Sequence, residues 1–269
     1  MRRQKISFDR IEKWARKNPI LVILSVTIVI SSSIVSLIDG GARLKEIYTD
    51  TLGDNSANYA KIQSLATGTQ IDYFSAVLGA PAFKNHEQTN YFEYVFVHPK
   101  YYVQAITDTE NNVLLYSVTT RVSGFNPTFG IGGIDSRSGK EFTVVLGKTK
   151  FDQLPFNPKK LEGDQGARRS YYREKYYFGN LGFYQNYDFA YSDSGYPQCE
   201  EVVPYDIIPK EESVYGIDMG KLPPELKRFR SVCVINTFSV SSFAADPKDD
   251  VDNQIYDIGA DYDQVRVLK

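Results

Sequence analysis

The longest apolar run of the chain extends from Ile20 to Ile38 and contains no charged residue, proline or glycine. As a helix rising 1.5 Å per residue it would be about 28 Å long, close to the ~30 Å thickness of a bilayer core. Seven Lys or Arg residues but only two acidic ones precede it, and such a bias holds the basic tail, residues 1–19, in the cytoplasm. We therefore predict a single transmembrane helix in contact with the lipid bilayer of the inner (plasma) membrane. Residues 39–269 would then lie outside the cytoplasm, in the periplasm.

Two alternatives stay open for this segment. A cleaved signal peptide also has a basic start and an apolar core, but such a core is usually shorter, about 7–15 residues. The sequence after the run, SLIDGGA, also lacks a clean cleavage motif. Charge bias only weights the orientation, so the reverse topology, with the large domain in the cytoplasm, is the second alternative.

After a juxtamembrane linker or helix at 39–54, the spacing of apolar residues is first that of helices and then that of strands. Apolar residues recur at helical spacing over 56–65 and 71–78. Alternating, strand-like runs follow at 91–97, 101–108 and 113–121. This order predicts a first α+β unit over residues 55–123.

The sharpest local signal surrounds the second predicted helix. Its residues are Gly68, Thr69, Phe74, Leu78, Gly79 and Pro81. Thr69 can cap the helix, with Asp72 bonding back as in a capping box. Gly79 is expected to end the helix with a positive φ, and Pro81 prevents its continuation. We assign this motif to structure and not to ligand binding.

The same segment resembles the opening of the SmpA/BamE-type envelope lipoproteins. The shared features are a glycine and a hydroxyl-capped helix, then Leu78-Gly79-Ala80-Pro81, then an aromatic-x-x-Tyr strand, here Tyr91-Phe92-Glu93-Tyr94. The resemblance covers about residues 55–121. It implies two helices packed on a three-stranded antiparallel sheet, in a module that assists envelope assembly.

The second half of the chain has the pattern of a divergent repeat. Gly147 and Thr149 precede a short apolar helix pattern that ends at Leu154. Strand-like runs follow at 171–178, 183–191, 230–243 and 264–268. Residues 124–140, rich in Gly, Asn, Pro and Ser, are predicted to form the loop between the two units. The predicted fold class is thus α+β, with a transmembrane helix and two small helix-plus-antiparallel-sheet units, the second over 141–269.

Charge and composition narrow the partners. The formal charge of −2 combines a tail of +5 with −7 on residues 39–269. An acidic domain is repelled by phosphates, so we expect no nucleic acid partner. The 20 Tyr and 16 Phe residues suit sheets with one solvated face and also suit a protein-binding surface.

The two cysteines, Cys199 and Cys233, are 34 residues apart. A disulfide between them would stabilise the fold by about 3 kcal/mol in the loop-entropy model. The sequence leaves the bonded and the free forms equally open.

No pattern of catalytic or metal-binding residues stands out. Gly133–Lys140 (GIDSRSGK) lacks the spacing and the hydroxyl of a phosphate loop. The two histidines, His86 and His98, have no zinc spacing. The acidic loop at Asp246, Asp249, Asp250 and Asp252 lacks the glycine and glutamate of a calcium loop. We therefore assign no catalytic, cofactor or metal residue and expect no enzyme.

These observations predict a membrane-anchored, extracytoplasmic protein-binding or envelope-assembly module with a protein partner. The first alternative is a cytoplasmic-facing sensor or effector with a membrane helix, for example in stress or phage defence. The second is an envelope hydrolase, which would need a cleft with perturbed carboxylates.

Overall fold

The computed structural model describes residues 55–85, 91–134, 141–166, 170–177, 185–210, 213 and 216–242. The chain divides into two units, Met1–Asp54 and Asn55–Lys269, and all described residues belong to the second. The predicted cytoplasmic tail, transmembrane segment Ile20–Ile38 and juxtamembrane linker lie outside them.

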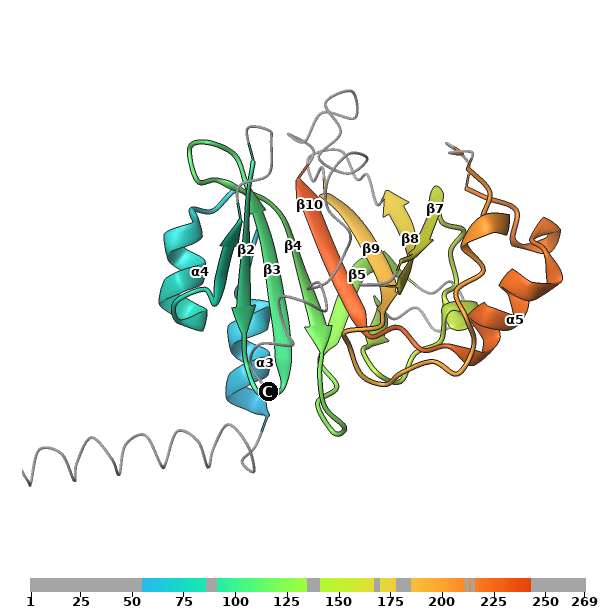
Figure 1. Ribbon diagram of the computed structural model, residues 1–269, viewed down its shortest axis with the longest axis horizontal. Coiled ribbons are helices and arrows are strands. Elements are labelled where there is room, and N and C mark those ends of the chain that lie inside the picture. The colour runs from blue at the N-terminus through green and yellow to red at the C-terminus, as the bar shows by residue number, and fades with distance from the viewer. Residues whose placement is uncertain are drawn as a thin grey trace, which may run out of the picture. The chain divides into compact units, whose positions relative to one another are not determined.

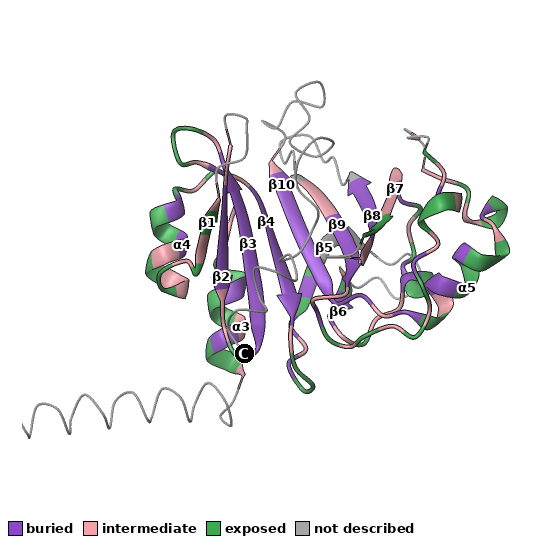
Figure 2. Ribbon diagram, viewed as in Figure 1, coloured by how far each residue is buried: buried purple, intermediate pink, exposed green. Residues whose placement is uncertain are grey.

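The second unit is built on an eight-stranded antiparallel sheet with the order β1-β2-β3-β4-β10-β9-β8-β7 (Figure 1). The strands are β1 (Phe83–Asn85), β2 (Phe92–Val97), β3 (Tyr101–Thr107), β4 (Val113–Thr120), β7 (Lys160–Gln165), β8 (Ser170–Tyr177), β9 (Gln185–Ser192) and β10 (Thr237–Ser242). A separate two-stranded sheet consists of β5 (Thr128–Ile134) and β6 (Glu141–Val145). The central strands β3, β4 and β10 are buried almost throughout (Figure 2).

One face of the main sheet is apolar and packs against the helices. These are α3 (Ser56–Gln63), α4 (Ile71–Leu78), α5 (Pro224–Val232) and the one-turn helices η1 (Phe151–Gln153), η2 (Tyr205–Ile207) and η3 (Met219–Lys221). From α4, Phe74 is fully buried and lies edge-on to Tyr116 of β4, with 5.6 Å between ring centroids. From α5, Phe229 contacts Tyr172 of β8 in the same manner at 5.1 Å. A single hydrophobic cluster therefore joins helices from both ends of the described chain.

The opposite face of the main sheet carries a polar row beside two small hydrophobic clusters, Val95 with Tyr102 and Ile106 with Leu115. A row of cross-strand neighbours crosses five strands and consists of Gln104, Ser117, Ser239, Asp188 and Lys175, all buried. Within it, the Ser117 hydroxyl donates to Gln104 Oε1 at 3.2 Å, and Gln104 Nε2 donates to Glu93 Oε1 at 2.6 Å.

The predicted fold class of two separate α+β units is wrong. β10 pairs in register with β4 through Thr237–Ser241 and with β9 through Thr237–Ser242, so strands of both halves form one sheet. The physical reason is that a separate sheet ending at β4 or β9 would leave a long edge of unpaired N–H and C=O groups. β10 satisfies both edges at once.

No helix in the described part of the chain is long and apolar enough to cross a membrane. The longest of those helices, α5, has nine residues, whereas a span needs about 20. The predicted transmembrane fold and the single-pass inner-membrane localisation therefore find no support among the described helices and are not retained; the segment Ile20–Ile38 itself lies outside the described residues.

Several element predictions also change. β5 lies within the predicted loop 124–140, and β7 lies in a polar stretch without strand alternation. Only the single turn η1 forms where a helix up to Leu154 was expected. The predicted strand 230–243 is divided, because α5 continues to Val232 before β10 begins at Thr237. The predicted strand 264–268 lies outside the described residues.

Candidate functional site

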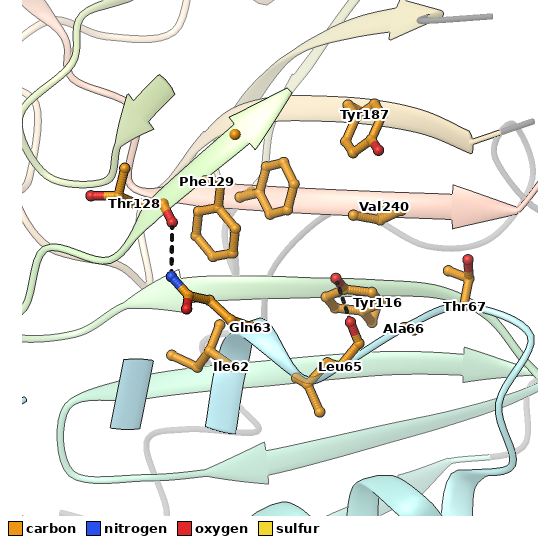
Figure 3. Close-up of a pocket in the computed structure, with 12 residues that line it drawn as sticks. Ile62, Gln63, Leu65, Ala66, Thr67, Tyr116, Thr128, Phe129, Tyr187 and Val240 are labelled. Atoms are coloured by element: carbon orange, nitrogen blue, oxygen red, sulfur yellow. Dashed lines mark hydrogen bonds between the residues drawn. The ribbon is translucent and has the colours of Figure 1, made fainter. Parts of the chain in front are cut away.

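A pocket of about 330 Å³ opens on the apolar face of the main sheet, above β4, β10 and β9 (Figure 3). α3 with the residues after it forms one wall, and β5 forms the other. The lining residues are Ile62, Gln63, Leu65, Ala66, Thr67, Tyr116, Thr128, Phe129, Gly130, Tyr187, Phe238 and Val240.

The floor of the pocket is a row of large, small and large side chains. Val240 of β10 lies in register between Tyr116 of β4 and Tyr187 of β9. Because valine is shorter than tyrosine, this row is hollow at its centre. Phe238, two residues earlier on β10, faces the same side and bounds the hollow along the strand.

The walls are held by packing and by a hydrogen bond. Phe129 of β5 stacks on Phe238, with 4.1 Å between ring centroids and 21° between ring planes. The Tyr116 hydroxyl donates to the carbonyl oxygen of Leu65 at 3.1 Å, which fixes the segment after α3 over the sheet (Figure 3). Two distant parts of the chain are thereby positioned around the same hollow.

The pocket is apolar at the bottom and polar at the mouth. Its six buried lining residues are all hydrophobic: Ile62, Leu65, Tyr116, Phe129, Phe238 and Val240. Gln63 and Thr128 are exposed at the mouth, and Gln63 Nε2 donates to the Thr128 carbonyl oxygen at 3.5 Å (Figure 3). A ligand with an apolar end and a polar end matches this gradient.

The lining offers little for catalysis. None of the twelve residues is Asp, Glu, Lys, Arg, His or Cys, the usual general acids, bases and strong nucleophiles. Burial raises the pKa of the Tyr116 hydroxyl well above its usual range, and the neighbouring Tyr187 is a second, smaller cause of the same shift. Tyr116 is therefore a neutral phenol at physiological pH and donates a hydrogen bond.

A buried ionic cluster lies elsewhere, beneath α5. Glu174 of β8 is fully buried, and its carboxylate accepts hydrogen bonds from Tyr172 (2.7 Å), Tyr176 (2.6 Å) and Arg230 Nε (2.5 Å). Arg230 Nη2 also donates to the Phe151 carbonyl oxygen at 2.8 Å. Burial, and then the Glu174 charge, raise the pKa values of Tyr172 and Tyr176 well above the usual range. Because both Glu174 oxygens accept bonds from within the protein, we assign this cluster to holding α5 on the sheet.

The two cysteines are joined. Cys199 and Cys233 form a disulfide with 5.3 Å between their Cα atoms, so the structure takes the bonded form of the two alternatives. The bridge ties the irregular segment after β9 to the end of α5 and lies outside the pocket lining.

The predicted structural motif lies beside the pocket without lining it. Gly79 has the positive φ expected at the end of the helix, 92°, and Gly68 also has a positive φ, 77°. Leu78 is half-buried, and Pro81 precedes β1. The predicted cap at Thr69 is wrong, because its hydroxyl donates to the Ala66 carbonyl oxygen at 2.8 Å and Gln70 occupies the N-cap position.

The other sequence candidates add no second site. His98 stacks on Tyr101, and its Nδ1 accepts a hydrogen bond from the Lys100 backbone at 3.1 Å. Among the described residues, no three His, Cys, Asp or Glu side chains are grouped to hold a metal ion. His86, residues 135–140 and the acidic loop 246–252 lie outside them.

The pocket itself was missed from the sequence. Its floor needs Tyr116, Tyr187 and Val240 to be neighbours, and they are far apart along the chain. The available signal was the alternation of large apolar residues in each strand, which shows what faces the core but not which strands pair.

Comparisons of the chain with protein-family models, with curated protein sequences and with solved structures found no match. The resemblance to the SmpA/BamE lipoproteins therefore stays a prediction.

Proposed function

We propose that this protein is a non-catalytic binding module that holds an apolar side chain of a protein partner in the pocket between α3, β5 and the main sheet. The observation that carries the proposal is the combination of a largely buried floor of Tyr116, Val240 and the half-buried Tyr187 with an uncharged polar mouth. Such a site favours burial of an apolar group and gives no group to transform it.

A protein partner fits the mouth better than a free metabolite does. The volume, about 330 Å³, is at the lower end for small-molecule pockets, which span roughly 300–1,000 Å³. Gln63 and Thr128 line the pocket and are exposed, so polar groups at its mouth are accessible to the peptide groups next to an inserted side chain. Amide and hydroxyl groups are suitable hydrogen-bond partners for a peptide backbone.

Selection from a random peptide library displayed on phage, with the 269-residue chain as target, tests the proposal. We expect enriched peptides to share one large apolar residue. Ala66→Trp, which fills the pocket, should abolish their binding, whereas Ala60→Trp on the exposed side of α3 should leave it unchanged. Equal binding by both variants, at equal thermal stability, would overturn the proposal.

A further inference from the structure

We infer that the group held in this pocket is a neutral aromatic ring, an inference that rests on the proposed function. The pocket brings together side chains from α3, β4, β5, β9 and β10, and their chemistry limits what the floor accepts.

Charge complementarity requires the inserted group to be neutral. An ionic group would lose its hydration on entry, and the twelve lining residues supply no side chain of opposite charge. Burying an unpaired charge is strongly unfavourable. The Tyr116 hydroxyl is already committed to the Leu65 carbonyl oxygen, so it is not a free donor for an anion.

The arrangement of rings favours an aromatic group over an aliphatic one. Phe129, Phe238 and Tyr187 form a continuous array, with centroid distances of 4.1 Å for Phe129–Phe238 and 6.0 Å for Tyr187–Phe238. Both pairs are nearly parallel, at 21° and 28°. A further ring entering beside this array gains offset or edge-to-face contacts at centroid distances of about 4.5–7 Å. A saturated ring of the same outline gains apolar contact alone.

The gradient of polarity also fixes the orientation. The ring enters first and lies against Val240, because that position is the low point of the floor. The polar groups that follow it remain at the mouth beside Gln63 and Thr128. A phenylalanine side chain followed by its own peptide groups has this distribution.

Three matched probes test the inference on the 269-residue chain: N-acetylphenylalaninamide, its cyclohexylalanine analogue and its 4-carboxyphenylalanine analogue. NMR titration followed at the Ala66 and Ile62 methyl groups reports occupancy of the pocket. We expect the phenyl probe to bind about twofold to tenfold more tightly than the cyclohexyl probe. The carboxylate probe should bind more weakly than both.

A variant of the pocket wall tests whether the ring of Phe129 contributes to the preference for an aromatic probe. Phe129→Leu keeps an apolar wall but removes the ring that stacks on Phe238, so the preference for the phenyl probe over the cyclohexyl probe should become smaller, with Phe238 and Tyr187 still present. Equal or tighter binding of the cyclohexyl or carboxylate probe to the unmodified chain would overturn the aromatic inference and leave the proposed function standing. If no probe shifts the Ala66 and Ile62 resonances and Ala66→Trp changes no peptide binding, both fail together.

Discussion

At the scale of single residues, two glycines with similar backbones differ in their surroundings. Gly79 has φ 92° and Gly147 has φ 77°, and both values are unfavourable for other residues. A Cβ at Gly79 would meet no atom within 4 Å, whereas one at Gly147 would lie 2.7 Å from Asn126 Nδ2. The first position is thus constrained by conformation alone, the second also by space.

We therefore expect Gly79→Ala to lower the free energy of unfolding by about 1 kcal/mol through backbone strain. Gly147→Ala should cost more, because Asn126 must also give up its hydrogen bond to the Leu146 carbonyl oxygen. Urea denaturation of the two variants gives the ranking. A Gly79→Ala chain as stable as the unmodified one would show that the helix end does not need a positive φ.

A residue-scale prediction on pH follows from Tyr116. Burial raises the pKa of its hydroxyl, so above pH 10.0, the ordinary value, the unfolded chain loses this proton while the folded chain keeps it. The contribution of the Tyr116 hydroxyl to the free energy of unfolding is therefore complete below pH 10.0 and declines as the pH rises above it, by up to about 1.4 kcal/mol per pH unit.

Urea denaturation from about pH 8 to about pH 11 measures this decline. Tyr116→Phe should reduce the slope of the unfolding free energy against pH by the contribution of one proton. At neutral pH the same variant should cost about 0.5–1.5 kcal/mol, because the hydrogen bond to Leu65 is lost. An unchanged slope would mean that the Tyr116 hydroxyl reaches solvent in the folded state.

At the scale of elements, α5 depends on its ionic contact with β8. Arg230→Met should destabilise the chain by about 3–5 kcal/mol, because it leaves the Glu174 carboxylate buried without its counter-ion. Arg228→Met is the matched control on the same helix. Arg228 is 72% exposed and pairs with Glu201, so its loss should cost at most about 1 kcal/mol. Thermal denaturation compares the two, and equal effects would contradict the assigned role of the buried pair.

The elements also show how far sequence patterns reach. The alternation that predicted strands at 91–97, 101–108 and 113–121 gave β2, β3 and β4 nearly to the residue, and helical spacing gave α4. α5 was missed because the β-branched residues near its end resemble a strand. β5 is rich in glycine and β7 is polar, so neither shows the usual alternation. The position of β10 between β4 and β9 is a long-range pairing that no local pattern encodes.

At the scale of the whole molecule, one main sheet and one large hydrophobic cluster that joins both halves predict a single cooperative unfolding transition for residues 55–269. Phe74→Ala, near β4, should cost about 3–5 kcal/mol, and Arg230→Met acts near β8. Either variant should shift one and the same unfolding midpoint, whether unfolding is followed by circular dichroism or by tyrosine fluorescence. Two separable transitions, each sensitive to one variant, would instead restore the two-unit fold.

The central place of β10 has a consequence for the order of events during synthesis. Its first residue, Thr237, is translated 117 residues after β4 ends at Thr120, a delay of roughly 6–23 s at about 5–20 residues per second. Until then β4 and β9 each lack the neighbour that completes their ladders. A nascent chain that stops before β10 lacks Phe238 and Val240, so the pocket cannot be completed until β10 has been translated.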